Sequence, residues 1–260
     1  MVIKWELEIP QLTGDTVRTA YLYLPDEYEE GSDQRYPVLY MFDGQNLFFD
    51  EDASYGKSWG LLGYLEENNV PLIVTGVSCN IFPEDSEYGG RLSEYSPFSF
   101  DDRHFGSIKG RGKITMDWLI NEYKPFIDEN YPTLPDRAHT FIAGSSMGGL
   151  MTLYAISQYN DVFSRGAALS PSLYFSPKEV SDMIMKGHYG KNTVLYMDNG
   201  QREFYLRSQL KLYSGIAAIL CRKKVLLTSR IVPRGVHNEA SWEKQIPFFI
   251  PTLLYDLDRR

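Results

Sequence analysis

The segment from Thr140 to Gly149 constrains the fold of this chain more than any other. Its first four residues, Thr-Phe-Ile-Ala, favour a buried strand, and the sequence then reads Gly-Ser-Ser-Met-Gly-Gly before a helix-forming run begins at Leu150. A G-x-S-x-G pattern between a strand and a helix is typical of a sharp turn that holds a serine in a strained conformation above the edge of a sheet. The segment therefore predicts an α/β sheet with a serine presented at one edge.

The positions of the glycines decide which of two adjacent serines occupies this turn. The tight bend brings backbone against backbone, so it leaves no space for a Cβ atom two residues before or after the serine. Centring the pattern on Ser146 places Gly144 and Gly148 at these positions, whereas centring it on Ser145 places an alanine and a methionine there. Ser146 is therefore the predicted nucleophile. The pattern alone is weak evidence, and it becomes specific only if a base and an acid follow in the expected order.

Strand patterns occur in eight segments. The first two alternate apolar and polar side chains and are predicted to be antiparallel, whereas the third segment and the first three residues of the fourth are continuously apolar, as strands buried on both faces are. Together they predict a mixed sheet with a parallel centre. The segments are Val2–Ile9, Val17–Leu24, Val38–Phe42, Leu72–Val77, Thr140–Ala143, Gly166–Leu169, Val194–Met197 and Val225–Val232.

Helical patterns separate the later strands, over residues 113–131, 150–159, 206–220 and 241–257. Pro125 is expected to kink or end the first helix near Lys124, because proline lacks the backbone N–H and crowds the preceding turn. Strands that alternate with helices in this order predict an α/β three-layer sandwich that binds ligands at the carboxyl ends of its strands. No linker-like composition shift divides the 260 residues, so a single domain over residues 1–260 is expected.

The charge and composition of the chain restrict the classes of molecule that it is expected to bind. The formal net charge of -8 and the absence of a basic run argue against nucleic acid or an anionic membrane. The N-terminus alternates apolar and charged residues, unlike a signal peptide, and no later segment predicts a membrane span, so a cytoplasmic location is expected. Cys79 and Cys221 are expected to be buried structural residues, with no metal and no cofactor, and formation of a homo-oligomer is left open.

A serine hydroxyl needs a base to accept its proton, and the chain has 4 histidines. His139 precedes the strand before the serine turn and is expected at its far end, while His104 and His188 fall in loops. Only His237 follows the last predicted strand, where the chain order serine, acid, histidine puts the base. We therefore predict His237 as the general base for Ser146.

The third catalytic group should orient the imidazole and stabilise its protonated form. It is expected after the strand at residues 194–197, where the sequence Asp-Asn-Gly-Gln-Arg-Glu contains two carboxylates. Asp198 ends the strand directly, whereas Glu203 lies beyond the Gly200 turn and can aim a longer side chain at His237. Glu203 is the preferred acid, and Asp198 is the alternative.

A developing oxyanion needs at least two aimed donors. The backbone amide of Met147, directly after the serine, is the first candidate. The second is expected from the short loop after Phe42, which reads Asp-Gly-Gln-Asn, and the amide of Gln45 is the candidate there. Two other roles are possible for this loop. It could be a turn that merely tolerates a positive φ, and the Asp43 side chain could act as a structural cap.

These residues together resemble the esterase group of α/β-hydrolases that includes esterase D, enterochelin esterase, feruloyl and acetylxylan esterases and the mycolyltransferases. The resemblance implies an α/β-hydrolase fold with a mostly parallel sheet of about eight strands and antiparallel N-terminal strands. It also implies Ser146, Glu203 and His237 as a catalytic triad, with the amides of Gln45 and Met147 as the oxyanion hole. Members vary between Asp and Glu in the acid turn. The segments that carry the resemblance are residues 36–48, 91–97, 131–133, 140–149, 168–172 and 200–203, and His237 with Trp242.

The loop over residues 80–112 is long, and long loops at the ligand edge of a sheet usually set specificity. Tyr95 in this loop, Trp242 beside the predicted base and Tyr174 after the sixth strand are expected to contact the substrate. Such rings suit a small-molecule or oligosaccharide ester, either an acylated sugar or a phenolic ester such as a feruloyl or acetyl ester. Arg91 and Glu94 in the same loop are expected to form a structural ion pair.

Three hypotheses about function follow. The first is hydrolysis of a carboxylic ester through an acyl-enzyme on Ser146. The second is acyl transfer to an alcohol or sugar, or cleavage of a thioester or siderophore ester, by the same residues. The third is a member that keeps the fold only to bind a ligand, and it is disfavoured because every position of the predicted triad is filled.

Overall fold

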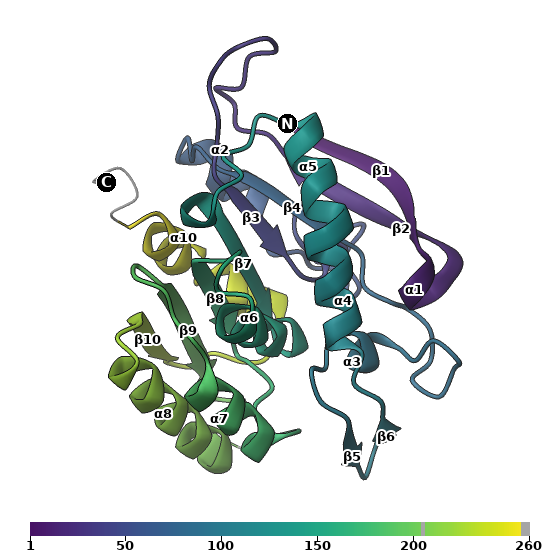
Figure 1. The fold of residues 1–260 in the computed structure, drawn as a ribbon, viewed down its shortest axis with the longest axis vertical. Helices are drawn as coiled ribbons and strands as arrows, with labels where there is room; N and C mark the ends of the chain where they lie inside the picture. Colours follow the sequence, from purple (N-terminus) through teal and green to yellow (C-terminus); the bar gives the residue numbers. More distant parts are fainter. Residues whose placement is uncertain (204–205, 256–260) are drawn as a thin grey trace.

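A mixed eight-stranded sheet forms the centre of residues 1–203 and 206–255, the part of the chain that this computed structural model describes. Its strands in chain order are β1 (Val2–Ile9), β2 (Gly14–Tyr23), β3 (Val38–Met41), β4 (Ile73–Val77), β7 (Thr140–Ser145), β8 (Arg165–Leu169), β9 (Val194–Gly200) and β10 (Leu226–Val232). They lie in the order β1-β2-β4-β3-β7-β8-β9-β10 (Figure 1). β1 pairs antiparallel with β2 and β2 with β4, and the pairings from β4 to β10 are parallel.

All of the predicted strands are present, and two of them end later than the sequence pattern indicates. β7 was expected to end at Ala143 and β9 at Met197, but β7 runs to Ser145 and β9 to Gly200. The extra residues of β7 remain paired with β8, because small and polar side chains fill a ladder as well as apolar ones when the backbone bonds are kept. Both strands therefore reach directly into the turns that carry the predicted chemistry.

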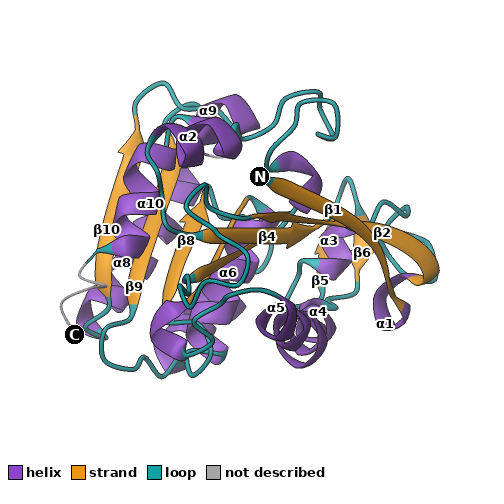
Figure 2. Cartoon of the chain, turned by 90° about the horizontal axis from the view of Figure 1, so that it is seen from above, coloured by secondary structure: helices purple, strands orange, loops and turns teal. Residues whose placement is uncertain are grey.

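Helices cover both faces of the sheet and give it three layers (Figure 2). One face packs against α4 (Gly112–Trp118), α5 (Lys124–Asn130), α6 (Met147–Gln158), α7 (Pro177–Lys186) and α8 (Leu206–Arg222), and the other against α2 (Leu61–Glu67), α9 (Glu239–Glu243) and α10 (Ile246–Leu254). Alternate residues of a strand point to opposite faces. In β3, Val38 and Tyr40 therefore join one core, and Leu39 and Met41 join the other. The predicted α/β fold class is confirmed.

Pro125 does not end the helical segment in which it lies, but the regular α-helix is interrupted just before Lys124, where the sequence predicts a kink or an end. α4 continues into a π-helical segment, Leu119–Tyr123, and then into α5, with Pro125 in the first turn of α5. In the π-helical segment the amide of Lys124 donates to the carbonyl of Leu119, five residues back. This wider turn leaves space for the proline ring and does not need the N–H that proline lacks, so the helical segment continues from α4 to α5.

The predicted helix over residues 241–257 is two helices, α9 and α10. Pro247 occupies the first turn of α10, where a proline is well tolerated because that N–H has no partner within the helix. The chain therefore restarts a helix at Ile246 and does not continue α9. Pro251 lies inside α10, and the predicted end of the helix at Leu257 is outside the described residues.

The prediction that both cysteines are buried is confirmed for one of them and wrong for the other. Cys79 is buried as predicted, but Cys221 is exposed, because it lies on the solvent side of α8 next to the buried Leu220. Among the described helices, none has both the length and the apolar character needed to cross a membrane.

The loops after β3 and β7 meet where the order of the strands reverses. From β3 the chain moves outward to β4 on one side, and it later returns to β7 on the other side of β3. A crevice at the carboxyl ends of the strands on either side of such a switch point is the usual ligand site of an α/β sheet. The topology therefore places the predicted nucleophile turn beside the predicted oxyanion loop.

Candidate active site

The turn between β7 and α6 holds Ser146 in a conformation that non-glycine residues rarely adopt. Its φ is 57° and its ψ is -119°. The amide of Ser146 donates to the carbonyl of Leu169 in β8 at 3.0 Å, which ties the turn to the neighbouring strand. A Cβ atom on Gly144 would lie 2.8 Å from the backbone of Gly148, so the bend requires the glycine. Strain of this kind, fixed by its surroundings, is typical of functional turns.

The structure brings the side chains of Ser146, His237 and Glu203 together from three separate loops. Nε2 of His237 lies 2.8 Å from Oγ of Ser146, and Nδ1 of His237 lies 3.0 Å from Oε2 of Glu203. His237 follows β10, and Glu203 follows β9. The Glu203 side chain is only 5% exposed and that of His237 is 21% exposed, so the contact is partly shielded from water.

The other histidine with a carboxylate partner lies far from this contact in the fold. His139 immediately precedes β7 and contacts Asp136 at 2.6 Å, at the opposite end of the strand from Ser146. Its predicted position is therefore confirmed. His139 and Asp136 form a surface pair with no serine within reach among the described hydrogen bonds.

Asp198, the alternative acid, faces away from the imidazole. Its carboxylate accepts hydrogen bonds from the amide of Ser170 at 3.1 Å and from the hydroxyl of Tyr196 at 2.9 Å. Burial raises the pKa of Asp198 to about 7, although these two hydrogen bonds oppose the rise. Of the two candidate carboxylates, the structure places Glu203 and not Asp198 against His237.

A small hydrogen-bond network fixes the second oxygen of Glu203. Oε1 accepts from the hydroxyl of Ser170 and from the amide of Gly200, both at 2.6 Å. The Ser170 hydroxyl in turn accepts from the indole N–H of Trp242 at 3.0 Å, and the Trp242 ring packs edge-on against His237. With one oxygen held by two donors, the other is aimed at the imidazole.

Sequence reasoning did not single out Ser170 or Ser172, although both follow β8 directly. The hydroxyl of Ser172 lies 3.2 Å from that of Ser146, and its amide donates to the carbonyl of Ser146 at 3.0 Å. Both serines are buried. Their place at the end of the strand next to the nucleophile strand is a signal that could have found them, because ends of adjacent parallel strands meet at one edge.

The two predicted oxyanion donors come from the two loops that follow β7 and β3. Met147 begins α6, and Gln45 lies in a 3-10 turn, Gly44–Asn46, directly after β3. Within residues 1–203 and 206–255, neither backbone amide has a protein hydrogen-bond acceptor. The Gln45 side chain is held by the amide of Cys79 at 3.0 Å and by its thiol at 3.3 Å, which fixes the loop.

The predicted ion pair between Arg91 and Glu94 does not form. Arg91 instead makes a two-pronged contact with Asp43 at 2.6 and 2.7 Å, and Glu94 pairs with Arg18 at 2.8 Å. Burial alone would lower the pKa of Arg91, but the adjacent Asp43 carboxylate raises it. The side chain of Asp43 accepts no capping hydrogen bond, so the alternative of a structural cap is also wrong.

A cavity of about 380 Å³ opens beside Ser146. Trp242 lines it, as expected for a residue beside the base, and its contact with a substrate stays a prediction. Tyr174 packs against Phe175 and is not among the described lining residues. The lining residues are Asp43, Gln45, Asn46, Ser54, Tyr55, Arg91, Ser145, Ser146, His237, Asn238, Glu239 and Trp242.

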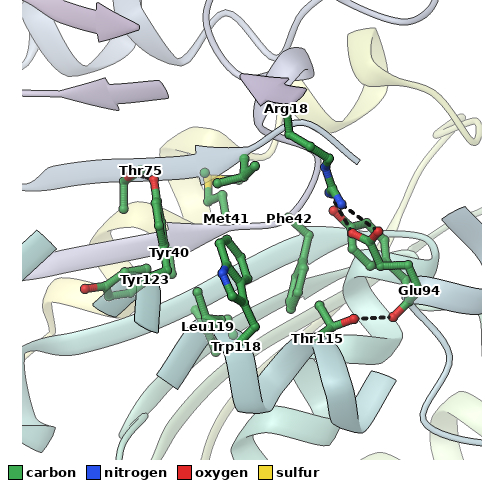
Figure 3. Close-up of a pocket in the computed structure, with 14 residues that line it drawn as sticks. Arg18, Tyr40, Met41, Phe42, Thr75, Glu94, Thr115, Trp118, Leu119 and Tyr123 are labelled. Atoms are coloured by element: carbon green, nitrogen blue, oxygen red, sulfur yellow. Dashed lines mark hydrogen bonds and ion pairs between the residues drawn. The ribbon is translucent and has the colours of Figure 1, made fainter. Parts of the chain in front are cut away.

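Tyr95 does not line this cavity, contrary to the prediction. It is 2% exposed, packs edge-on against Phe42 and accepts a hydrogen bond from the amide of Asp43 at 3.2 Å. It faces a second, much smaller cavity of about 30 Å³ in the core. Figure 3 shows this space between Phe42, Trp118 and the buried pair of Arg18 and Glu94. A space of this size holds no more than about two waters, so it is a packing void and not a substrate site.

No metal cluster accompanies the site in the described residues, where no group of three or more His, Cys, Asp or Glu side chains is arranged to hold an ion.

The sheet order, with a serine on a strained turn after a central strand, defines the α/β-hydrolase fold. Residues 13–253 match the model of the family described as "Putative esterase", and the chain therefore belongs to this esterase family.

Three known proteins are similar to this chain. The uncharacterized protein YbbA of Bacillus subtilis is 28% identical over 158 residues, which cover 59% of this chain and 56% of that protein. An endo-1,4-beta-xylanase/feruloyl esterase of Xylanibacter ruminicola is 32% identical over 173 residues, which cover 64% of this chain and 21% of that protein. The chain thus spans little more than half of the first relative and about a fifth of the second. The structure of the siderophore hydrolase EstA of Aspergillus nidulans has a TM-score of 0.72 at 17% identity, covering 96% of this chain and 94% of that one, and shows the same fold.

Proposed function

We propose that this protein hydrolyses carboxylic esters of acylated sugars or phenolic acids through an acyl-enzyme formed on Ser146. The observation that carries the proposal is the hydrogen-bond chain from Oγ of Ser146 through His237 to Glu203, with distances of 2.8 and 3.0 Å. The first distance allows proton transfer from Ser146 to His237, and the second allows Glu203 to orient the imidazole and stabilise its charged form. Membership of the esterase family supports the same reaction class.

In the first half-reaction, Oγ of Ser146 attacks the carbonyl carbon of the ester while Nε2 of His237 takes the hydroxyl proton. Glu203 stabilises the positive imidazolium that results. The carbonyl oxygen becomes negative, and the amides of Gln45 and Met147 are the donors that we assign to it, because neither has another acceptor among the described residues. The tetrahedral intermediate then collapses. The alcohol leaves with the proton from His237, and the acyl group stays on Ser146.

In the second half-reaction, His237 takes a proton from water, and the water oxygen attacks the acyl carbonyl. The acid leaves, and the proton returns to Oγ of Ser146, so that the free enzyme is restored. Replacement of the water by a second alcohol would give acyl transfer through the same steps. Product analysis with and without added alcohol separates the two outcomes.

The assignment of the substrate class draws on one relative and on the cavity. The matching protein from Xylanibacter ruminicola is named as a xylanase and feruloyl esterase, which supports a feruloyl or acetyl ester of a sugar. The cavity beside Ser146, with its open mouth and hydrogen-bonding walls, suits the sugar part of such an ester.

Ser146→Ala is expected to abolish hydrolysis of p-nitrophenyl acetate, and a fluorophosphonate probe should label the wild type at Ser146 but leave the variant unlabelled. Mass spectrometry of the digested protein locates the adduct. A matched pair tests the base: His237→Asn should lose activity, whereas His139→Asn, at the opposite end of β7, should keep it. Labelling at another serine, or full turnover by Ser146→Ala, would overturn the proposal.

A further inference from the structure

Glu239 is a buried carboxylate that lines the cavity beside Ser146 and has no described side-chain partner. It is the first residue of α9 and is 7% exposed. Among the described contacts, its carboxylate has a hydrogen bond only with its own backbone amide, and no cation pairs with it. Buried carboxylates usually have a partner, because a charge taken out of water without one is costly. An unpartnered one that faces a cavity indicates a ligand group that supplies the missing donors.

The other charges in the cavity compensate Glu239 only in part. Asp43 and Arg91 also line it, but they are bound to each other by two short contacts at 2.6 and 2.7 Å, so their charges largely cancel. Burial is the main cause that raises the pKa of Glu239, and Asp43 raises it further, whereas Arg91 and His237 lower it. His237 contributes no fixed positive charge when it is neutral, as a general base must be before it takes the proton. The cavity therefore has a net negative character whenever Glu239 is ionised.

The neutral part of the cavity wall combines hydrogen-bonding groups with one accessible aromatic ring. Gln45, Asn46, Ser54 and Asn238 supply amide and hydroxyl groups. Trp242 is only 5% exposed and packs against Trp59, so the exposed Tyr55 offers the more accessible ring. Such a wall suits a substrate group with several hydroxyls, because each hydroxyl can meet a polar partner.

We propose that Glu239 is a specificity-determining residue that binds a hydroxyl or ammonium group of the substrate and excludes substrates with a carboxylate at that place. The inference deepens the proposed function and rests on it, because it assigns the cavity beside Ser146 to the sugar part of the ester. The preferred substrate is an ester of a neutral or amino sugar. An ester of a uronic acid is a poor substrate, because its carboxylate would lie near that of Glu239 in a partly buried site.

The test compares three matched acetyl esters: acetylated methyl glucoside, acetylated methyl glucuronoside and acetylated methyl glucosaminide with a free amine. Hydrolysis is measured at pH 8, which favours the ionised form of the Glu239 carboxylate. The wild type should prefer the glucoside over the glucuronoside in kcat/KM, and Glu239→Gln should raise the relative kcat/KM of the glucuronoside on the order of tenfold, mainly through KM. The same change should lower the relative kcat/KM of the glucosaminide.

Glu243→Gln is the matched control, because it removes the same charge from the same helix. The side chain of Glu243 is 40% exposed, is not among the described residues that line the cavity, and pairs with Lys57 at 3.1 Å. The control should leave the ratio of glucoside to glucuronoside unchanged within about twofold, as expected for a solvent-screened charge. An equal shift in both variants, or no shift in Glu239→Gln, would overturn the proposal.

Calorimetry separates this inference from the proposed reaction. Binding of the three esters to Ser146→Ala, with and without Glu239→Gln, measures the charge preference without any turnover. The same order of affinities, with the uronate weakest and recovering in Glu239→Gln, supports the specificity role even if hydrolysis fails. Equal affinities for all three esters refute it even if hydrolysis of p-nitrophenyl acetate is fast.

Discussion

Replacement of Glu203 by glutamine is expected to present the wrong nitrogen of His237 to Ser146. In the wild type, Oε1 of Glu203 accepts from the Ser170 hydroxyl and the Gly200 amide, and Oε2 faces Nδ1 of His237. The Gly200 N–H can only donate, so the glutamine must keep its oxygen at the position of Oε1. Its NH2 group must then point at the imidazole.

An NH2 group opposite Nδ1 requires that Nδ1 accept a hydrogen bond, so the neutral ring carries its proton on Nε2. Nε2 then donates to Oγ of Ser146 and cannot take its proton. The side chain also loses the negative charge that stabilises the imidazolium. The equivalent acid-to-amide change in a serine protease lowers kcat about 10⁴-fold. We expect kcat of Glu203→Gln to fall about 10³ to 10⁴-fold, or roughly 4 to 5.5 kcal/mol, with little change in KM.

Steady-state hydrolysis of p-nitrophenyl acetate measures kcat and KM, and nitrogen NMR of the histidine rings reports which nitrogen of His237 carries the proton. Asp198→Asn is the matched control. Because the pKa of Asp198 is raised to about 7, an amide resembles its protonated form and can keep the contacts with Ser170 and Tyr196. We expect its kcat to stay within about threefold of the wild type. A larger fall for Asp198→Asn than for Glu203→Gln, or a proton still on Nδ1 in the latter, would refute the reasoning.

Three further predictions follow from the same surroundings. Ser170→Ala removes one of the two donors that fix Oε1 of Glu203, so kcat should fall about tenfold at constant KM in the same assay, and an unchanged kcat would count against a positioning role. Gly144→Ala puts a Cβ atom 2.8 Å from the backbone of Gly148, so thermal unfolding followed by circular dichroism should occur several degrees lower and esterase activity should drop, and a variant with wild-type values would contradict the steric argument. The folded chain keeps the proton of Asp198 up to about pH 7, whereas the unfolded chain releases it near the ordinary aspartate pKa, so the free energy of unfolding should decrease as pH rises between these two values and then level off. In urea titrations, Asp198→Asn should reduce the difference between pH 5 and pH 8 by about 2 to 3 kcal/mol, and an unchanged difference would exclude Asp198 as its source.

Most of the fold could be predicted from the sequence because strand patterns are local. β3 is buried throughout and its four residues are continuously apolar, whereas the edge strand β1 and the first half of β2 alternate between covered and exposed side chains. The passage of the helix through Pro125 could not be predicted in this way. It depends on a π-helical turn whose Tyr123 stacks on Trp118 and is hydrogen-bonded to Thr75 of β4, and both contacts exist only in the folded chain.

The residues of the candidate site that the sequence located share one property, which is that each lies in the turn or loop that follows a parallel strand. Ser146 follows β7, Gln45 follows β3, Glu203 follows β9 and His237 follows β10. In a parallel sheet these positions meet at one edge, so knowledge of the strands is sufficient to bring them near each other. The choice of Glu203 over Asp198 needed one more argument, the reach of a longer side chain beyond a glycine turn.

The failed predictions involve side chains whose partners are distant in sequence. Arg91 and Glu94 are three residues apart in a short helix, α3 (Arg91–Glu94), and local spacing favours a pair. Each instead contacts a residue at least 48 positions away. A buried charge requires the partner that best compensates its desolvation, and tertiary packing decides which partner that is. The prediction that Tyr95 contacts the substrate is wrong for the same reason. Its hydroxyl accepts a hydrogen bond from a buried backbone amide, and its ring packs in the core.

The position of Glu239 beside the cavity could have been inferred from the sequence with one further argument about helical spacing. Trp242 was predicted to lie beside the substrate, and positions three apart on a helix share a face, so a helix that turns Trp242 toward the cavity also turns Glu239 toward it. The carboxylate one residue further on, Glu243, faces Lys57 and solvent instead. Helical spacing does not by itself separate the two glutamates, because positions four apart also share a face; the pair with Lys57 is what holds Glu243 away from the cavity. This is why the Glu239→Gln and Glu243→Gln pair tests the geometry of the site and not merely its net charge.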